Sequence, residues 1–301
     1  MTCELIFPGK WINADAFEKT IKGNPHSCGS QEVTFRFYAD CKLMVDVCIR
    51  ILSLANQLHS SLHRVKLIFD DGEDGVMGYL NRIGFFDCLD PGIEVSPARP
   101  TWSGAAIHRG GNMGLVEIAR INKNLRDKTI HGRLAEAVGH ACVHRADVSS
   151  LEEATWTIFS ELIDNIFSHS QTPLDGYAAL QRYSNGNEIK IAVSDSGLGI
   201  LQTLRPALAS EFPTLTGLTD TQLIVEIFRQ GLSRHGTDRG CGLRGSAAKA
   251  IKFQADLEVR LPNSRVVLKP SRQAYTANTA HCYESLPLMW GTHITFSLKL
   301  T

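Results

Sequence analysis

Four short stretches of this sequence carry side chains that could do chemistry together. In the first, Glu161 and Asn165 stand four residues apart, within a stretch whose apolar side chains recur every three or four positions. This spacing predicts a helix that presents both side chains on one face. A carboxylate and an amide placed in this way can act as a proton acceptor and as a ligand for a hard metal ion. A solvated helix face is the ordinary alternative for such a pair.

The second stretch is a strand ending followed by glycines. Apolar residues alternate with more polar ones over residues 189–193, which predicts a strand that stops near Asp195. Gly197 and Gly199 follow, and their lack of a Cβ atom lets a flat ligand approach the backbone beside the Asp195 carboxylate. A simple turn is the alternative interpretation.

The third and fourth stretches lie nearer the C-terminus. Residues 236–243 are rich in glycine and lead into a segment of helical composition over residues 244–253. A glycine-rich loop before a helix N-terminus is suited to phosphate groups, because free N–H groups and the positive end of the helix dipole meet there. A flexible linker is the alternative. Gly291 and Thr292 then open an alternating strand over residues 294–298.

Taken in order, these stretches resemble the GHKL superfamily of ATPases, which includes the type II topoisomerase B subunits, the Hsp90 chaperones, the histidine kinases and the MutL repair proteins. That superfamily has a Glu-x-x-x-Asn helix, an Asp-x-Gly-x-Gly turn, a mobile lid, a Gly-x-Gly loop and a late Gly-Thr strand. All five have counterparts within residues 151–301. The resemblance implies a Bergerat-type fold, an α/β two-layer sandwich with a mixed sheet and helices on one face.

The resemblance also implies roles for individual residues. Asn165 is expected to coordinate Mg²⁺, and Asp195 to accept a hydrogen bond from the adenine amino group of ATP. Gly197 and Gly199 are expected to let the backbone approach the base, while the hydroxyl of Thr292 supports the adenine side.

On the phosphate side, the resemblance places Gly240, Gly242 and Leu243 in the loop that holds the phosphates. The segment between Gly199 and Gly240 corresponds to the ATP lid. Its arginines and those just after it are candidates to reach the phosphates, with solvated lid charges as the alternative; they are Arg234, Arg239 and Arg244. Glu161 is expected to be the general base for water, as in the hydrolysing members, whereas the kinase members use the equivalent carboxylate differently.

The N-terminal part reads as a small α/β accessory domain. Strands are predicted over residues 33–38 and 64–69, and helices over residues 43–61 and 74–84. This order resembles STAS domains, but their Asp-x-Ser phosphorylation site is not evident, because the second strand ends in Phe69-Asp70-Asp71-Gly72.

Prolines and glycines over residues 90–114 predict a linker that contains the domain boundary. Residues 115–147 are predicted to be helical, and residues 262–290 look like an insertion between the last two strands. The predicted division is an N-terminal α/β domain, a linker with a helical connector and an ATP-binding domain, over residues 1–100, 101–150 and 151–301 respectively.

Composition narrows the class of protein. Lys plus Arg and Asp plus Glu both number 31, so the charge balance gives no indication of nucleic acid as a main partner. We find neither a run of 18 apolar residues nor a basic, then apolar, N-terminal leader, and we therefore expect a cytoplasmic protein without a membrane span. Eight scattered cysteines predict reduced, mostly buried thiols.

The sequence thus predicts a Mg-ATP-binding protein whose slow ATP hydrolysis drives a conformational or dimerisation switch, with a homodimer or another protein as partner, for instance in a bacterial multi-protein system. A serine protein kinase of the anti-sigma-factor type is one alternative, since Asn165, Ser168 and His169 resemble the helix ending of those kinases. A nucleotide-sensing interaction module without turnover is the other.

Overall fold

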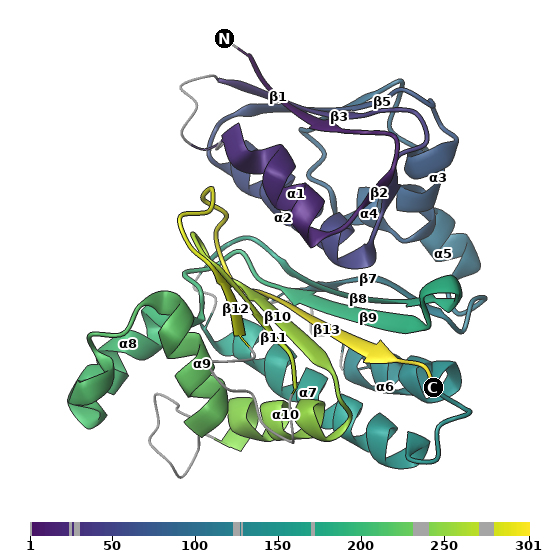
Figure 1. Cartoon of the computed structure of the whole chain (residues 1–301). Coiled ribbons are helices and arrows are strands. Elements are labelled where there is room, and N and C mark those ends of the chain that lie inside the picture. The colour runs from purple at the N-terminus through teal and green to yellow at the C-terminus, as the bar shows by residue number, and fades with distance from the viewer. Residues whose placement is uncertain are drawn as a thin grey trace.

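The computed structural model describes residues 2–23, 26, 31–122, 127, 129–169, 172–230, 241–270 and 280–301. These residues form four layers, in the order sheet, helices, sheet, helices (Figure 1). The first two layers come from the N-terminal third of the chain. The last two come from the remainder, so the order of the layers follows the order of the sequence.

The N-terminal unit is a parallel sheet with helices on one side. Its strands pair in the order β1-β3-β5-β6, and all three pairings are parallel. The elements are β1 Thr2–Phe7, β2 Trp11–Ile12, α1 Ala14–Thr20, η1 Ile21–Gly23, β3 Glu32–Phe37, β4 Lys42–Leu43, α2 Val45–Ser60, β5 Arg64–Phe69, α3 Gly75–Arg82, α4 Phe85–Cys88, β6 Glu94–Ser96 and α5 Gly104–His108.

The parallel sheet packs against its helices through every second side chain of its strands. Phe7, Phe37 and Phe69 stand in register on three neighbouring strands, and their rings stack with centroids 4.9 Å and 4.7 Å apart. All three side chains are buried against the helices, as the period of a half-buried strand requires. The predicted strands over 33–38 and 64–69 are therefore confirmed to within one residue at each end, and both predicted helices are present as α2 and α3.

The second sheet has seven strands in the order β12-β11-β10-β13-β9-β8-β7. We expected a mixed sheet, but every neighbouring pair among the strands that the structure describes is antiparallel. Short connections explain part of this pairing, since only antiparallel neighbours can be joined by a tight turn. The strands are β7 Leu115–Ile121, β8 Gly176–Tyr183, β9 Glu188–Ser194, β10 Asp256–Arg260, β11 Arg265–Leu268, β12 Ala280–Tyr283 and β13 His293–Lys299.

Helices cover one face of this sheet, below it in Figure 1. The predicted helix around Glu161 is confirmed as part of α7, and its Phe159 ring packs edge-on against Phe296 of β13, 5.5 Å between centroids. The helices of this part are α6 Ile130–Ala141, α7 Val148–His169, α8 Ile200–Glu211, η3 Pro213–Leu215, α9 Asp220–Gln230 and α10 Cys241–Lys252, with η2 Ser184–Gly186 between β8 and β9.

Two predicted assignments between these elements are wrong in part. Residues 115–121 were expected to be helical, but they form β7, and only residues 130–141 of that stretch form a helix before α7 begins. The strand is buried on both faces, which removes the alternation that would have identified it. The stretch 262–290 was expected to be an insertion between the last two strands, but it contributes two further strands, β11 and β12, to the sheet.

The N-terminal unit covers the other face of the seven-stranded sheet. Helix α2 packs on β8 and β9 (Figure 1). Charged side chains are buried where the two parts meet. Arg260 of β10 is fully buried and pairs with both carboxylate oxygens of Glu18 at 3.1 Å, while Arg50 of α2 pairs with Glu258. Breaking a buried ion pair leaves an unpaired charge in a medium of low polarity. The two parts are therefore fixed to each other by charge as well as by apolar packing.

Candidate functional site

Asp195 and Thr292 lie side by side at the ends of two paired strands. Strand β9 stops at Ser194 and β13 starts at His293, and these two residues are partners in the register. One position further, the Asp195 N–H donates to the Thr292 carbonyl at 3.0 Å, and the Thr292 N–H donates to Oδ2 of Asp195 at 3.2 Å. The two residues that the sequence placed on the adenine side are thus brought together from 97 positions apart.

Two of the three glycines beside them have conformations that favour glycine. Gly197 donates its N–H to Oδ1 of Asp195 at 2.7 Å, and Gly199 has φ of +83°. Gly291 has φ of +94°, and a Cβ atom there would lie 1.9 Å from the backbone oxygen of Asp195. The strand ends can therefore approach each other only because Gly291 has no side chain.

The electrostatics of Asp195 differ from those of an exposed carboxylate. Burial raises the pKa of Asp195 to about 6, against the effect of the hydrogen bonds from Gly197 and Thr292, which lower it. The residue as a whole is partly exposed to solvent. Asp195 is therefore an acceptor whose charge changes just below neutral pH.

Strand alternation decides which side of the sheet this pair faces. Val193 and Ile294 belong to the core beneath the helices, whereas Ala192 belongs to the core beneath the N-terminal unit. Side chains two positions apart point to the same face of a strand, so Asp195 lies on the same face as Val193, and Thr292 on the same face as Ile294. This is the face that the helices cover. Thr292 also accepts a hydrogen bond on its hydroxyl from the N–H of Ile200, the first residue of α8, at 2.8 Å. Asp195 and Thr292 therefore face the layer that contains α7.

Helix α7 carries the two remaining residues expected to do chemistry. Glu161 is exposed, and Asn165 lies one turn further along, although its side chain is outside the described residues. The next residue, Ile166, packs at Gly176, where a Cβ atom would lie 2.9 Å from Cγ2 of Ile166 and 2.8 Å from the carbonyl of Ser194. The Asn165 end of α7 therefore lies beside the end of β9, one residue before Asp195.

The expected phosphate loop is described only in part. Arg239, Gly240 and Arg234 lie outside the described residues. The predicted helix after the loop is confirmed as α10, but it begins at Cys241, so the backbone of Gly242 and Leu243, which were expected in the loop, lies in its first turn with that of Arg244. The side chains of Leu243 and Arg244 are outside the described residues. Helix α10 packs against α7, which places it in the same layer as the predicted general base.

Sequence reasoning missed the residues that support this pair from the other side of the sheet. Gln57 of α2 bonds to Ser196 and to the backbone of Trp290, the immediate neighbourhood of Asp195 and Thr292. The one available signal was a glutamine within the apolar run of a predicted buried helix. Nothing in the sequence indicated which distant segments it contacts.

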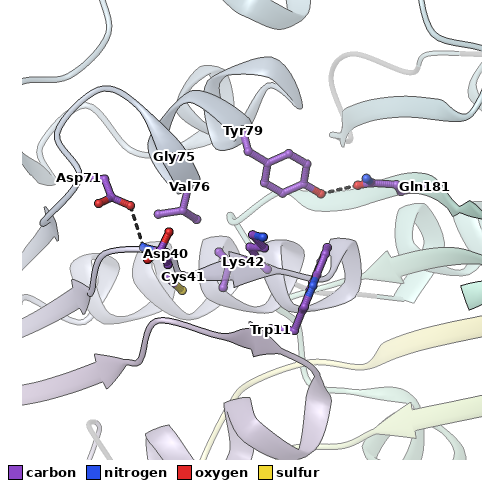
Figure 2. A pocket seen from close by; sticks show the side chains of 10 residues that line it. Trp11, Asp40, Cys41, Lys42, Asp71, Gly75, Val76, Tyr79 and Gln181 are labelled. Atoms are coloured by element: carbon purple, nitrogen blue, oxygen red, sulfur yellow. Dashed lines mark hydrogen bonds between the residues drawn. The ribbon is translucent and has the colours of Figure 1, made fainter. Parts of the chain in front are cut away.

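A separate cavity of about 310 Å³ lies where β3 and β5 end (Figure 2). The Asp71 carboxylate accepts a hydrogen bond from the Asp40 N–H at 2.9 Å, and Tyr79 donates to Gln181 of β8, which closes the cavity against the larger sheet. The neighbouring Cys41 is buried, which raises the pKa of its thiol to about 12, so it stays protonated near neutral pH. None of the residues predicted from the sequence for the ATP site lines this cavity.

Comparison with known proteins adds no family assignment. No protein-family model matches the chain, and no curated protein matches it. In the described part of the chain, no helix has the length and apolar character that crossing a membrane requires. Within the same residues, no group of three or more His, Cys, Asp and Glu side chains is placed to hold a metal ion.

Proposed function

We propose that residues 151–301 bind Mg-ATP and hydrolyse it slowly, and that the bound nucleotide drives a conformational or dimerisation switch. The observation that carries this proposal is the hydrogen-bonded pair of Asp195 and Thr292 at two neighbouring strand ends, where Gly199 and Gly291 have positive φ angles. The order of motifs that resembles the GHKL superfamily supplies the identity of the ligand.

The Asp195 carboxylate suits an adenine amino group in two respects. Each of its oxygens accepts one backbone hydrogen bond, and a carboxylate has about four acceptor positions, so capacity remains for a ligand N–H. Its position is also fixed from both sides by the chain, because Gly197 and Thr292 hold different oxygens. A preorganised acceptor loses little conformational freedom when the base binds.

The roles on α7 follow from the helix spacing. Glu161 would hold the proton that an attacking water gives up, and its exposure leaves it accessible to water. Asn165 would contribute its side-chain oxygen to Mg²⁺. A Mg²⁺ ion held there would supply positive charge to offset that of the phosphates.

Two alternatives share the binding site and differ in chemistry. A serine protein kinase would transfer the terminal phosphoryl group to a protein hydroxyl, with Asn165, Ser168 and His169 ending the helix as in the anti-sigma-factor kinases. A nucleotide-sensing module would bind ATP without turnover. The carboxylate at Glu161, on the face that it shares with Asn165, favours hydrolysis over sensing alone.

One experiment separates these three outcomes. The full chain is incubated with Mg²⁺ and ATP labelled in its γ-phosphate, and both free phosphate and labelled protein are measured. We expect free phosphate without stable protein label. Label on the protein or on an added protein substrate would favour the kinase, and calorimetric binding without either product would favour the sensor. Absence of ATP binding would refute the proposal as a whole.

A further inference from the structure

Gln57 joins the N-terminal unit to both strand ends that carry the candidate adenine site. Its side chain is 1% exposed. The Nε2 group donates to the carbonyl of Trp290 at 2.9 Å and to Oγ of Ser196 at 3.0 Å, while Oε1 accepts from the Trp290 N–H at 2.9 Å. Both N–H bonds and the oxygen of the amide are thus used. Ser196 adjoins Asp195, and Trp290 precedes Thr292 by two positions.

A second chain of hydrogen bonds runs in parallel one turn earlier on α2. Ser53 and Ser194 have hydroxyl oxygens 3.0 Å apart, and Ser194 also contacts Nδ1 of His293. Burial, together with the positive charges of Arg50 and Arg260, holds the pKa of His293 well below its usual value, so the ring is neutral. Its Nε2 lies 3.0 Å from the Trp290 carbonyl, which can only accept.

This neutrality fixes the direction of the second chain. Nε2 of His293 carries the proton and donates to Trp290, so Nδ1 must accept from the Ser194 hydroxyl. The Ser194 oxygen is then left to accept from Ser53. Together with Gln57, these bonds satisfy polar groups on both strand ends from the face opposite to the Asp195 carboxylate. The position of that carboxylate relative to Thr292 therefore depends on α2 as well as on strand pairing.

We propose that Gln57 is a positioning residue for base recognition, through which docking of the N-terminal unit and occupancy of the adenine site are coupled. The inference rests on the proposed function, since it concerns the same site. Such coupling is reciprocal: a docked α2 tightens ATP binding, and bound ATP stabilises the docked position of α2 by the same factor. Gln57 touches no nucleotide in this scheme and acts only through the segments around Ser196 and Trp290.

The test compares two neighbouring amides of α2. Asn56 is also buried, and it likewise makes three hydrogen bonds: to the Cys88 carbonyl at 3.1 Å, to the Tyr177 hydroxyl at 2.8 Å and from the Asp90 N–H at 2.9 Å. None of these partners is on the segments that Gln57 holds. Gln57→Met and Asn56→Leu keep the shape of each side chain and remove its hydrogen bonds, so both should lower the melting temperature.

Only Gln57→Met should change base recognition. Calorimetry on the full chain measures the affinities for ATP and for inosine triphosphate. Inosine triphosphate lacks the amino group whose hydrogen bond Asp195 would accept. We expect ATP affinity to fall about 5- to 150-fold in Gln57→Met, the usual range of coupling between two sites. The preference for ATP over inosine triphosphate should fall with it. Asn56→Leu should keep both values within about twofold of the parent.

The outcomes separate the two proposals. A parent protein that binds no ATP refutes the proposed function, and this inference with it. A parent that binds ATP, with a Gln57→Met variant that keeps both the affinity and the base preference, refutes the inference alone. If Gln57→Met does not fold, Ser196→Ala replaces it, because that change removes a single bond from Gln57; an unchanged base preference in Ser196→Ala would then overturn the inference.

Discussion

Thr292 holds Asp195 at both its backbone and its side chain. The Thr292 carbonyl accepts from the Asp195 N–H at 3.0 Å, and the Thr292 N–H donates to Oδ2 of Asp195 at 3.2 Å. The carboxylate is thus oriented by the strand that comes last in the chain, rather than by its own strand alone. Substitutions that disturb either strand end should therefore impair the same proposed function, recognition of the base.

The first prediction concerns the Asp195 carboxylate. Asp195→Asn replaces an oxygen with an NH₂ group that cannot accept from Gly197 or Thr292, or from an adenine amino group. A hydrogen bond to a charged group contributes about 1.5–3 kcal/mol, so ATP affinity should drop roughly 10- to 150-fold. Calorimetry with Mg-ATP measures the change. An affinity equal to that of the parent would remove Asp195 from base recognition.

The second prediction is a pH dependence of binding. Because the pKa of Asp195 is raised to about 6, its carboxylate is increasingly protonated below that pH. The ionised carboxylate is the stronger acceptor for a ligand N–H, so ATP affinity should rise with pH through about 6 and level off above it. The free energy of unfolding has the opposite sign for this group, since a raised pKa contributes stability at low pH that is lost as the pH rises through about 6. A binding curve with the same pH profile in Asp195→Asn would contradict the assignment.

The third prediction concerns the approach of the two strand ends at Gly291. Gly291→Ala would place a Cβ atom 1.9 Å from the Asp195 carbonyl oxygen, at a φ of +94°. Backbone strain of this kind costs about 1–3 kcal/mol, and relief of the clash should add to it. Urea unfolding measures the loss. Gly132→Ala in α6 is the matched control, because its Cβ atom would meet nothing within 4 Å, and it should be neutral or stabilising.

The fourth prediction separates chemistry from binding on α7. Glu161→Ala should retain ATP affinity while turnover falls by about 10²–10⁴, the usual contribution of a general base. Asn165→Ala should weaken both, because it removes a Mg²⁺ ligand. Glu153→Ala, another exposed glutamate of the same helix, should change neither. Phosphate release at the parent rate in Glu161→Ala would exclude Glu161 from the mechanism and favour the kinase or the sensor.

The fifth prediction concerns the buried charges between the two parts of the chain. Glu18→Ala leaves Arg260 fully buried without its carboxylate partner and should cost about 3–5 kcal/mol of unfolding free energy. Glu4→Ala removes a comparable contact to Arg36 on the exposed face of the parallel sheet, at 2.8 Å, and should cost much less, because solvent screens an exposed ion pair. Equal losses of unfolding free energy in the two variants would show that the ion pair of Glu18 does not contribute more stability than that of Glu4.

Sequence patterns predicted the helices and strands that have one buried and one exposed face. Strands with one buried face, such as those around Phe37 and Phe69, show alternation, and α7 shows its helical period. The same patterns missed β7, because apolar side chains on both of its faces are buried, each face in a different hydrophobic core. Antiparallel pairing of β9 with β13 also lies beyond local patterns, since about 100 residues separate the two strands.

The site divides in a similar way. Asp195, Gly199 and Thr292 were identified by residue type and order, and the structure brings them together. The contribution of Gln57 depends on how a helix from the first third of the chain docks on the last third, 233 positions away. No local signal encodes such a contact, whereas the residues that a ligand would touch have recognisable types.

The layer of helices between the two sheets has a practical consequence for anyone who wishes to shorten this protein. The core beneath the N-terminal unit includes Tyr177, Ala179, Ala192 and Met289, all from beyond residue 150. A fragment that starts after the expected boundary would expose these apolar side chains to water and leave Arg260 without Glu18. Its surface would favour aggregation. The excision of residues 1–100 is therefore a change to the interior of the C-terminal part, and a fragment of that kind should be judged by its folding before its activity is compared.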